Sequence, residues 1–279
     1  MSSNQKVAVV TGSSSGIGHE TALILARNNY LTYATMRNLD KGSGLKKIAA
    51  KENLESKIRF IQLDVTSDNS VKNAIQTISS EAGRIDVLVN NAGYGLTGAF
   101  EDLSIEEIKS QYETNVFGLI RVTQAVLPIM RKQRSGIIVN ISSGAGRFGY
   151  PSGSAYVSTK FAVEGLTESM SYEVEPFGIR MVLVEPGVIK TNFFNSMTIA
   201  KKSQDPTSPY LPMLNGMESS IGKMMENGST PDYVAKIVYE AVSSSNPKLR
   251  YLAGKDVEQW MEGKKNMSDE EFHNMMKQM

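Results

Sequence analysis

A tyrosine and a lysine four residues apart, Tyr156 and Lys160, are the leading candidates for acid–base chemistry in this 279-residue chain. They lie in a segment expected to be helical, so both side chains would project from one helix face. A neighbouring ammonium group stabilises a phenolate and lets tyrosine exchange a proton nearer neutral pH. Such a pair also occurs by chance on solvated helices. Ser143 makes it informative, because it ends an expected strand, where ligands bind in open parallel sheets.

A glycine-rich turn, Thr11 to Gly18, follows the first expected strand and opens the first expected helix. Backbone N–H groups at a helix N-terminus are unpaired and partly positive, so they can bind a phosphate that approaches over glycine. The spacing G-x-x-x-G-x-G differs from the common G-x-G-x-x-G fingerprint, but it meets the same geometric need. The turn predicts dinucleotide contacts from Gly12, Ser14, Ser15, Gly16, Ile17 and Gly18.

Two further glycine patterns indicate other chemistry, and their context argues against both. Gly12 to Gly16 also spells the G-x-S-x-G elbow of serine hydrolases, with His273 as a conceivable partner. That fold places several strands before its elbow, whereas only eleven residues precede Gly12. Gly144 to Gly149 matches G-x-G-x-x-G literally, but turn residues follow it, so no helix N-terminus is available there.

Short apolar runs alternate with amphipathic segments over the first 185 residues, which predicts an α/β fold: a doubly wound, Rossmann-like parallel sheet in one domain, 1–279. Two long helices are expected at 104–131 and 154–175. The expected strands are Lys6 to Thr11, Leu31 to Arg37, Ile58 to Asp64, Ile85 to Asn90, Gly136 to Ser142, Ile179 to Glu185 and Arg250 to Ala253.

The chain changes character after Pro186. Residues 192–229 are rich in Pro, Ser and Met without clear periodicity, and we interpret this insertion after the sixth strand as a substrate lid. Thr230-Pro231-Asp232 reads as the start of a helix. Residues 268–279 form a C-terminal helix with a Ser268 capping box and an apolar stripe. Docking on its own domain is the simplest interpretation of that stripe, with a subunit contact or a substrate-site cover as alternatives.

Composition limits the partners. The 30 basic and 29 acidic side chains are interspersed, which gives no reason to expect a nucleic acid. The absence of cysteine excludes disulfides and thiolate catalysis, and with two histidines we expect no metal site. The N-terminus lacks a signal-peptide core and no apolar run approaches a membrane span, so we expect a cytoplasmic protein.

Seven motifs in order resemble the short-chain dehydrogenase/reductase family. The match covers nearly the whole chain up to Thr191, and the strand from Tyr33 and the Arg250 to Gly254 end are similar to the branch with 17β-hydroxysteroid and retinol dehydrogenases. The motifs are TGSSSGIG from Thr11, LDVT from Leu63, NNAG from Asn90, TNVFG from Thr114, NISS from Asn140, YVSTK from Tyr156 and EPGVIKT from Glu185.

The resemblance implies an oxidoreductase that moves a hydride between nicotinamide and a carbonyl or alcohol carbon. Tyr156 would be the general acid or base, and Ser143 would polarise the substrate oxygen. Lys160, together with the positive nicotinamide of the oxidised cofactor, would lower the pKa of Tyr156, and it would also bind the nicotinamide ribose. Asn115, a poor helix former, would interrupt its helix, and either its backbone or its side chain would hold a water that relays protons to Lys160. The implied cofactor contacts are Asp64, Val65, Asn91, Ala92, Gly93, Pro186, Ile189 and Thr191, with Asn90 structural.

The second strand bears on the choice of cofactor. It ends at Arg37 with no carboxylate in the place where one would accept from the ribose of NAD, and an arginine can fork onto a 2′-phosphate. We therefore expect NADP(H) in preference to NAD(H). The Met-rich lid favours a small-molecule substrate that is a bulky hydrophobic ketone, aldehyde or secondary alcohol, with a polar sugar or an acyl-carrier thioester as the alternative. Its methionines are Met197, Met213, Met217, Met224 and Met225. A homodimer or homotetramer is implied, and a catalytically silent NADP-binding sensor remains a different class of function.

Overall fold

A seven-stranded, fully parallel sheet forms the centre of the protein, in the order β3-β2-β1-β4-β6-β7-β9. The computed structural model describes residues 5–191, 193 and 197–277, with the backbone alone for 218–221. The predicted doubly wound architecture is confirmed, and each predicted strand is present with ends shifted by at most a few residues. The strands are β1 Val7–Val10, β2 Leu31–Met36, β3 Ile58–Gln62, β4 Val87–Asn90, β6 Gly136–Ile141, β7 Ile179–Pro186 and β9 Arg250–Ala253.

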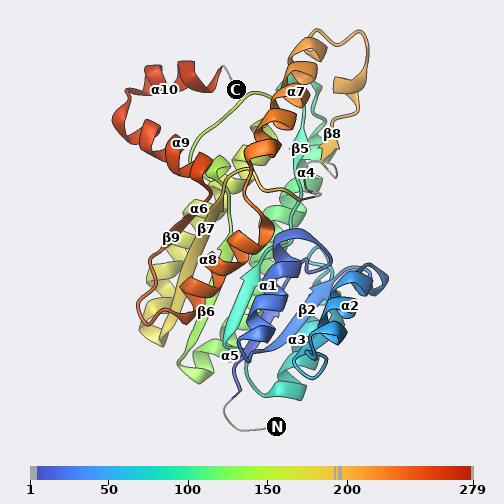
Figure 1. Ribbon diagram of the computed structural model, residues 1–279, viewed down its shortest axis with the longest axis vertical. Helices are drawn as coiled ribbons and strands as arrows, with labels where there is room; N and C mark the ends of the chain where they lie inside the picture. The colour runs from blue at the N-terminus through green and yellow to red at the C-terminus, as the bar shows by residue number, and fades with distance from the viewer. Residues whose placement is uncertain (1–4, 192, 194–196, 278–279) are drawn as a thin grey trace.

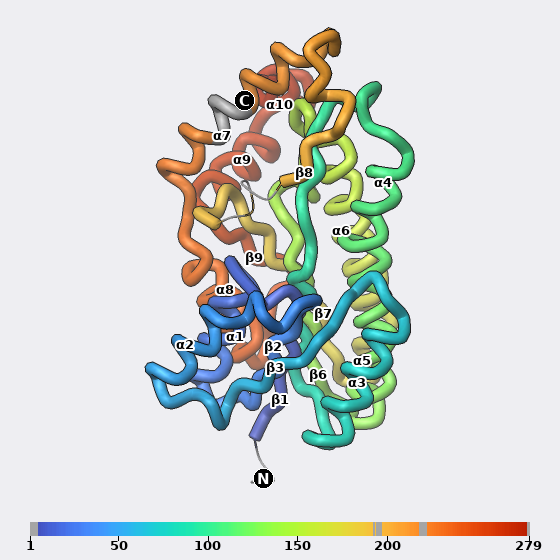
Figure 2. The backbone as a smooth tube through the Cα atoms, turned by 90° about the vertical axis from the view of Figure 1, so that its right-hand side faces the viewer, coloured from blue at the N-terminus to red at the C-terminus, as the bar shows by residue number. Residues whose placement is uncertain are grey.

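Helices cover both faces of this sheet, as the continuous apolar strands require. Figures 1 and 2 show α1, α2 and α8 on one face and α3, α5 and α6 on the other. The helices that flank the sheet are α1 Gly16–Arg27, α2 Ser43–Lys51, α3 Asp68–Ala82, α5 Gly118–Gln133, α6 Ser154–Val174 and α8 Pro231–Ser243. The start of α8 at Pro231 confirms the predicted helix start.

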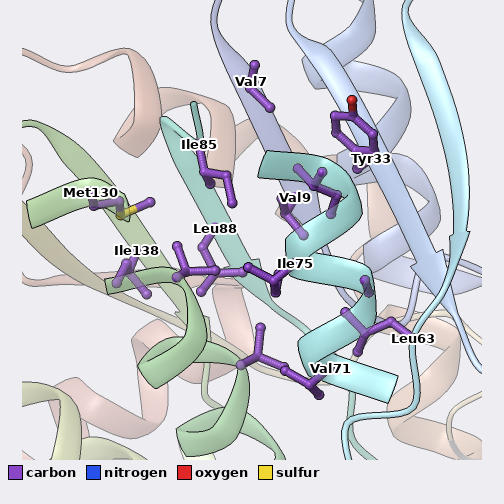
Figure 3. Packing of buried hydrophobic residues seen from close by; sticks show 14 of the residues in the cluster. Val7, Val9, Tyr33, Leu63, Val71, Ile75, Ile85, Leu88, Met130 and Ile138 are labelled. Carbon is purple, nitrogen blue, oxygen red and sulfur yellow. The ribbon is translucent and has the colours of Figure 1, made fainter. Parts of the chain in front are cut away.

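The core lies between the sheet and these helices. On the α3 and α5 face, Val71 and Ile75 of α3 pack toward Leu88 of β4, and Met130 of α5 packs toward Ile138 of β6 (Figure 3). All five side chains are buried. Because these clusters fix the helices against the strands, they also fix the loops at the carboxyl ends of the strands.

The predicted first long helix is present but has a defect at its centre. It consists of α4 Ile105–Tyr112, a π-helical turn at Glu113–Phe117 and α5. The π turn contains Asn115, so the predicted local interruption at this residue is confirmed. Such turns insert one residue into a helix and redirect its side chains, and they are frequent at functional sites.

The insertion after β7 contains more regular structure than its sequence indicates. Residues 192–229 were expected to lack periodic structure, but they include β8 Thr198–Ile199, which pairs in parallel with β5 Leu96–Thr97, and the 17-residue helix α7 Leu211–Asn227. The periodicity was obscured by Pro212 and by glycines within the helix. Residues 192 and 194–196 of this predicted lid lie outside the described residues.

Two short helices complete the chain, α9 Lys255–Asn266 and α10 Asp269–Met276. Both lie at the end of the molecule to which the strands point, the same end as α7, and β1 begins at the opposite end (Figure 1). The predicted capping box between Ser268 and Glu271 is present. Phe272 and Met276 pack on Phe148, so α10 docks on its own domain, and Met279 of the predicted stripe lies outside the described residues. Among the described helices, none is long and apolar enough to cross a membrane.

Candidate active site

A cavity of about 1360 Å³ lies across the carboxyl ends of the central strands. It brings together almost every site residue predicted from the sequence. Only Gly18 and Asn115 are absent from its walls. The predicted residues that line it are Gly12, Ser14, Ser15, Gly16, Ile17, Arg37, Asp64, Val65, Asn91, Ala92, Gly93, Ser143, Tyr156, Lys160, Pro186, Ile189 and Thr191.

The glycine turn forms one end of the cavity. Gly12 and Gly16 both have positive φ, +68° and +60°, which other residues rarely adopt. Ser15 is the N-cap of α1, yet its side chain does not cap the helix. The first N–H groups of α1 therefore remain free to bind an anion, and a Cβ on Gly12 would come within 3.0 Å of Ala92 Cα. This is the cradle that a diphosphate requires.

Asn91 holds this turn from the neighbouring strand. Its Nδ2 donates to the carbonyl oxygens of Thr11 at 2.9 Å and Gly12 at 3.2 Å. In return, Thr11 Oγ1 accepts hydrogen bonds from the N–H groups of Asn91 and Ala92, each at 3.0 Å. Gly18 lies beneath this network, because a Cβ there would be 2.4 Å from Asn91 Nδ2. The predicted contribution of Gly18 is thus close packing and not a wall of the cavity.

Tyr156 and Ser143 face each other on the cavity wall. Burial raises the pKa of Tyr156 to about 12, and a hydrogen bond with Ser143 acts in the opposite direction. In the protein alone burial has the larger effect, and the lowering of this pKa by Lys160 together with the oxidised nicotinamide stays a prediction for the cofactor-bound enzyme. Ser143 Oγ also accepts from Ala145 N at 3.1 Å, which orients the hydroxyl.

Lys160 lies one helical turn from Tyr156, as its spacing predicts. Its Nζ is 5.6 Å from the centre of the Tyr156 ring and donates to the carbonyl oxygen of Ile141 at 2.9 Å. The residue is 8% exposed, and this burial lowers its pKa to about 8, while the carboxylate of Glu164 raises it. The lysine is therefore largely, but not completely, protonated at neutral pH.

Asn115 contributes through the loop that follows β4. Its Oδ1 accepts from Tyr94 N at 3.0 Å, while its Nδ2 donates to Tyr94 O at 2.9 Å and to Thr159 Oγ1 at 3.3 Å. The side-chain amide is thus fully engaged in positioning Tyr94 and α6. Because these hydrogen bonds occupy the side chain of Asn115, the backbone carbonyl is the group of this residue that we expect to hold the water.

Asn90 confirms its predicted structural role. It is 5% exposed, and its Nδ2 donates to Thr123 Oγ1 and to Asn140 Oδ1, both at 2.9 Å. Asn140 in turn donates to Thr167 Oγ1 at 2.8 Å. This buried network joins two central strands to α5 and α6, and it fixes the helix that carries the tyrosine and lysine.

Two cations stand where the second strand ends. Arg37 is exposed and lines the cavity beside the glycine turn, as predicted. Lys41, which was not predicted, is also exposed and lines the same part of the cavity. Lys41 was not predicted because it lies four residues further on, in a short 3₁₀ helix at Leu39–Gly42 that no strand pattern indicates. Asp64 lies at the neighbouring strand end, where its Oδ1 accepts from Thr66 N at 3.0 Å and Thr66 Oγ1 at 2.8 Å.

The other half of the cavity is apolar. Met197, Met213, Met217 and Met224 from the insertion line it, while Met225, grouped with them in the Met-rich stretch, does not. Three aromatic side chains that were not predicted from the sequence, Phe148, Tyr150 and Trp260, form a wall of this half. Trp260 contacts Phe148 edge to face, with 5.6 Å between ring centres. The apolar stripe of the C-terminal helix indicates that this part of the chain packs on another surface, but the stripe does not indicate which face of the domain that surface is.

Comparison with known proteins agrees with this geometry. Residues 6–202 match the short chain dehydrogenase family. An uncharacterized oxidoreductase of Bacillus subtilis is 40% identical over 256 residues, 91% of each chain. The 3-ketodihydrosphingosine reductase of Bacteroides thetaiotaomicron is 37% identical over 252 residues, 89% of this chain and 88% of that one. Retinol dehydrogenase 8 of Bos taurus is 37% identical over 264 residues, 90% of this chain and 82% of that one, in agreement with the predicted branch.

Solved structures give the same result. A short-chain dehydrogenase from Streptomyces avermitilis superimposes with a TM-score of 0.85 at 32% identity, covering 98% of this chain and 97% of that one. ElxO with NADP bound gives a TM-score of 0.77 at 31% identity, covering 92% and 100%. The chain belongs to the short-chain dehydrogenase family of oxidoreductases.

Proposed function

We propose that this protein is an NADP(H)-dependent oxidoreductase that interconverts a hydrophobic ketone or aldehyde with its alcohol. One observation carries the proposal: Ser143, Tyr156 and Lys160 line the same cavity as the glycine turn, which forms the other end of that cavity. A hydroxyl, a phenol and an ammonium group beside a dinucleotide cradle form the set that hydride transfer to a carbonyl requires.

The residues at the cradle fit a nicotinamide dinucleotide. The free N–H groups of α1 and the turn around Gly12 would hold the diphosphate, and the loop from Pro186 to Thr191 would hold the nicotinamide end. That loop is kept in place from two sides, since Val188 N donates to Asp256 Oδ2 at 2.6 Å and Lys190 N donates to Ser229 O at 2.8 Å. When bound, the cofactor supplies or accepts the hydride.

The chain's own residues then handle the proton. The Ser143 hydroxyl would hold the substrate oxygen against Tyr156, whose phenol donates its proton to that oxygen during reduction and takes it back during oxidation. Lys160 would stabilise the phenolate that forms briefly and would bind the nicotinamide ribose. The backbone carbonyl of Asn115 would hold the water that returns a proton to the lysine.

The preference for NADP(H) rests on Arg37 and Lys41. Both are exposed cations on the cavity beside the turn, and an arginine fork matches the geometry of a 2′-phosphate. ElxO, a structural neighbour, has been solved with NADP bound. We expect Arg37→Asp to weaken NADPH binding at least tenfold, because it replaces attraction by repulsion. Comparing the Michaelis constants for NADPH and NADH tests the preference, and a lower value for NADH refutes it.

The proposed substrate is apolar and bulky, because methionines of the insertion and three aromatic side chains enclose the space next to Tyr156. The names of two relatives, a 3-ketodihydrosphingosine reductase and a retinol dehydrogenase, point to the same substrate class. We interpret residues 192–229 as the lid over this space. The thioester and sugar alternatives do not make use of this apolar wall.

The subunit arrangement is a separate part of the proposal. Phe117, the last residue of the π turn before α5, is 50% exposed, and Phe161 and Tyr172 on α6 are 46% and 70% exposed. Large apolar side chains gathered on two neighbouring helices favour a contact with a second copy. We expect a homodimer or homotetramer through these helices, and light scattering that gives a monomer mass at micromolar concentration would refute it.

A panel of long-chain ketones and aldehydes, incubated with NADPH and followed by its absorbance, tests the function directly. We expect turnover that falls by a factor of about 10³ in Tyr156→Phe, because proton transfer by a positioned side chain contributes roughly 10² to 10⁴. NADPH binding should be retained in the variant. Tight NADPH binding without turnover of any carbonyl would indicate the sensor function instead.

A further inference from the structure

Beyond Lys160 along α6 lies a cluster of partly and fully buried charges, Glu164, Arg250, Glu185 and Arg147, that has no role in the proposed proton transfer. Glu164 lies on α6 one helical turn beyond Lys160 and is 5% exposed. Its Oε2 accepts a hydrogen bond from Arg250 Nε at 2.9 Å. The same guanidinium lies 3.4 Å from Glu185 Oε1, which also forms an ion pair with Arg147 at 3.0 Å. An isolated carboxylate is costly to bury, and here the arginines from β9 and from the loop after β6 compensate the two carboxylates, Glu164 and Glu185.

The environment of Glu164 leaves its charge only partly compensated. Its second oxygen, Oε1, is buried and accepts no hydrogen bond from the described residues. Its side chain passes over Gly146, where a Cβ would lie 2.8 Å from Glu164 Cγ and 3.1 Å from the carbonyl oxygen of Lys160. The missing side chain at position 146 therefore makes room for the carboxylate beside the backbone of the lysine.

We propose that Glu164 is a positioning residue that keeps Lys160 protonated in its buried site, with Arg250 holding the carboxylate in place. This inference rests on the proposed function, since it assigns Glu164 to the service of the catalytic lysine. A buried lysine tends to lose its proton, and a neutral amine could neither stabilise the phenolate nor attract the ribose hydroxyls. A fixed negative charge one turn away opposes that loss.

The charged groups of this cluster come from α6, β7, β9 and the loop after β6. Tyr156 on α6 keeps its proton at neutral pH and contributes no charge. Arg250 from β9 and Arg147 from the loop after β6 are cations, and Glu185 from β7 pairs with both of them. Burial, together with the neighbouring Glu164, raises the pKa of Glu185 to about 7, so Glu185 carries its full charge only above neutral pH. Glu168, a turn beyond Glu164, pairs with Arg250 at 2.6 Å, but its side chain is 46% exposed. The carboxylate of Glu164 is the one that raises the pKa of Lys160, against the effect of burial.

The matched pair of variants is Glu164→Gln and Glu168→Gln. Each removes one carboxylate from the same arginine, but only the first removes the buried carboxylate one helical turn from Lys160. The first readout is an NMR titration of the cofactor-free protein with ¹³C-labelled lysine. The Lys160 signal should titrate near pH 8 in the unsubstituted protein, well apart from exposed lysines. We expect Glu164→Gln to lower this midpoint by on the order of one pH unit and Glu168→Gln to leave it unchanged.

The second readout is the pH profile of kcat/KM for carbonyl reduction. Its alkaline limb should move to lower pH in Glu164→Gln by the same amount, while the rate well below the limb stays within about twofold. Glu164→Asp keeps the charge and should retain most of the original limb. Loss of structure alone would lower the rate at every pH and would not move the limb.

The double variant Glu164→Gln with Arg250→Gln covers the case in which an unpaired guanidinium unfolds the single variant. It should shift the midpoint in the same direction. A Lys160 midpoint that stays within about 0.2 units of the original, or that moves equally in Glu168→Gln, overturns the proposal. Failure of the proposed oxidoreductase function would appear differently, as absent turnover in the unsubstituted protein, and the NMR titration would still test Glu164.

Discussion

Replacing Gly18 by alanine should destabilise the protein and weaken cofactor binding together, although Gly18 does not line the cavity. The added Cβ would lie 2.4 Å from Asn91 Nδ2 and 2.6 Å from Gly12 O, so both atoms must move by about 1 Å to reach ordinary van der Waals contact. Asn91 then loses its hydrogen bonds to Thr11 O and Gly12 O. Gly12 cannot yield easily, because its positive φ already fixes the turn.

The magnitude follows from these contacts. Two hydrogen bonds contribute roughly 1 kcal/mol each, and overpacking a tight site costs about 1 to 3 kcal/mol. We therefore expect the free energy of unfolding to fall by about 3 to 5 kcal/mol, or the melting temperature by about 6 to 20 °C for a chain of this size. Movement of the turn should also raise the dissociation constant for NADPH at least tenfold, which corresponds to about 1.4 kcal/mol.

Gly44→Ala is the matched control. Gly44 lies in α2, where a Cβ would have no neighbour within 4 Å, so the same substitution should be neutral or stabilise the helix by up to about 1 kcal/mol. Urea unfolding and NADPH fluorescence titration measure both effects. If Gly18→Ala unfolded within about 0.5 kcal/mol of the unsubstituted protein and bound NADPH equally well, the packing argument for the turn would be wrong.

Three further predictions concern other parts of the site. Lys160→Met should remove a pH dependence of the free energy of unfolding. The pKa of Lys160 is about 8 in the folded protein against 10.5 in the unfolded chain, so the unfolded chain binds the proton more tightly. The folded state is therefore most stable above pH 10.5 and loses about 3 kcal/mol as the pH falls to 8, which urea unfolding measures. Equal pH dependence in both proteins would count against it. Asp102→Asn should loosen the base of the insertion, since Asp102 accepts from Ser203 and Ser208 there, and should speed proteolysis of the insertion several-fold; an unchanged digestion rate argues otherwise. Trp260 is the only tryptophan and lines the cavity, so an apolar ligand should change its fluorescence, and a saturating substrate without effect on emission would remove it from the site.

The sequence predicted those parts of the fold that depend on local pattern. Continuous apolar strands such as Ile179 to Glu185 have no alternative to a position buried on both faces, so their existence and parallel arrangement were determined locally. The glycine turn and the Tyr156 and Lys160 pair were equally accessible, because both depend on short spacings. The relation of Asn115 to a helix defect also followed from its poor helix propensity.

The parts that escaped prediction depend on contacts between distant segments. Trp260 reaches Phe148 across more than a hundred residues, and no local pattern specifies that meeting. The pKa of Tyr156 was expected to fall because its lysine neighbour is visible in the sequence, whereas the burial that raises it is a property of the assembled cavity. The charge chain from Glu164 to Arg250 and Glu185 joins three separate elements and is likewise invisible before the fold is known.

The protonation state of the site sets its pH response. With pKa values of about 12 for Tyr156 and about 8 for Lys160, the phenol holds its proton at neutral pH while the ammonium holds its own below pH 8. A protonated phenol is an acid, so the resting site is ready to protonate a carbonyl oxygen, whereas alcohol oxidation needs the phenolate, which becomes more abundant as pH rises. We therefore expect reduction to be fastest below pH 8 and oxidation to increase towards alkaline pH until Lys160 loses its charge. Rates measured in both directions with the same substrate pair test this, and an oxidation rate that falls steadily from pH 6 to pH 8 would show that another group carries the proton.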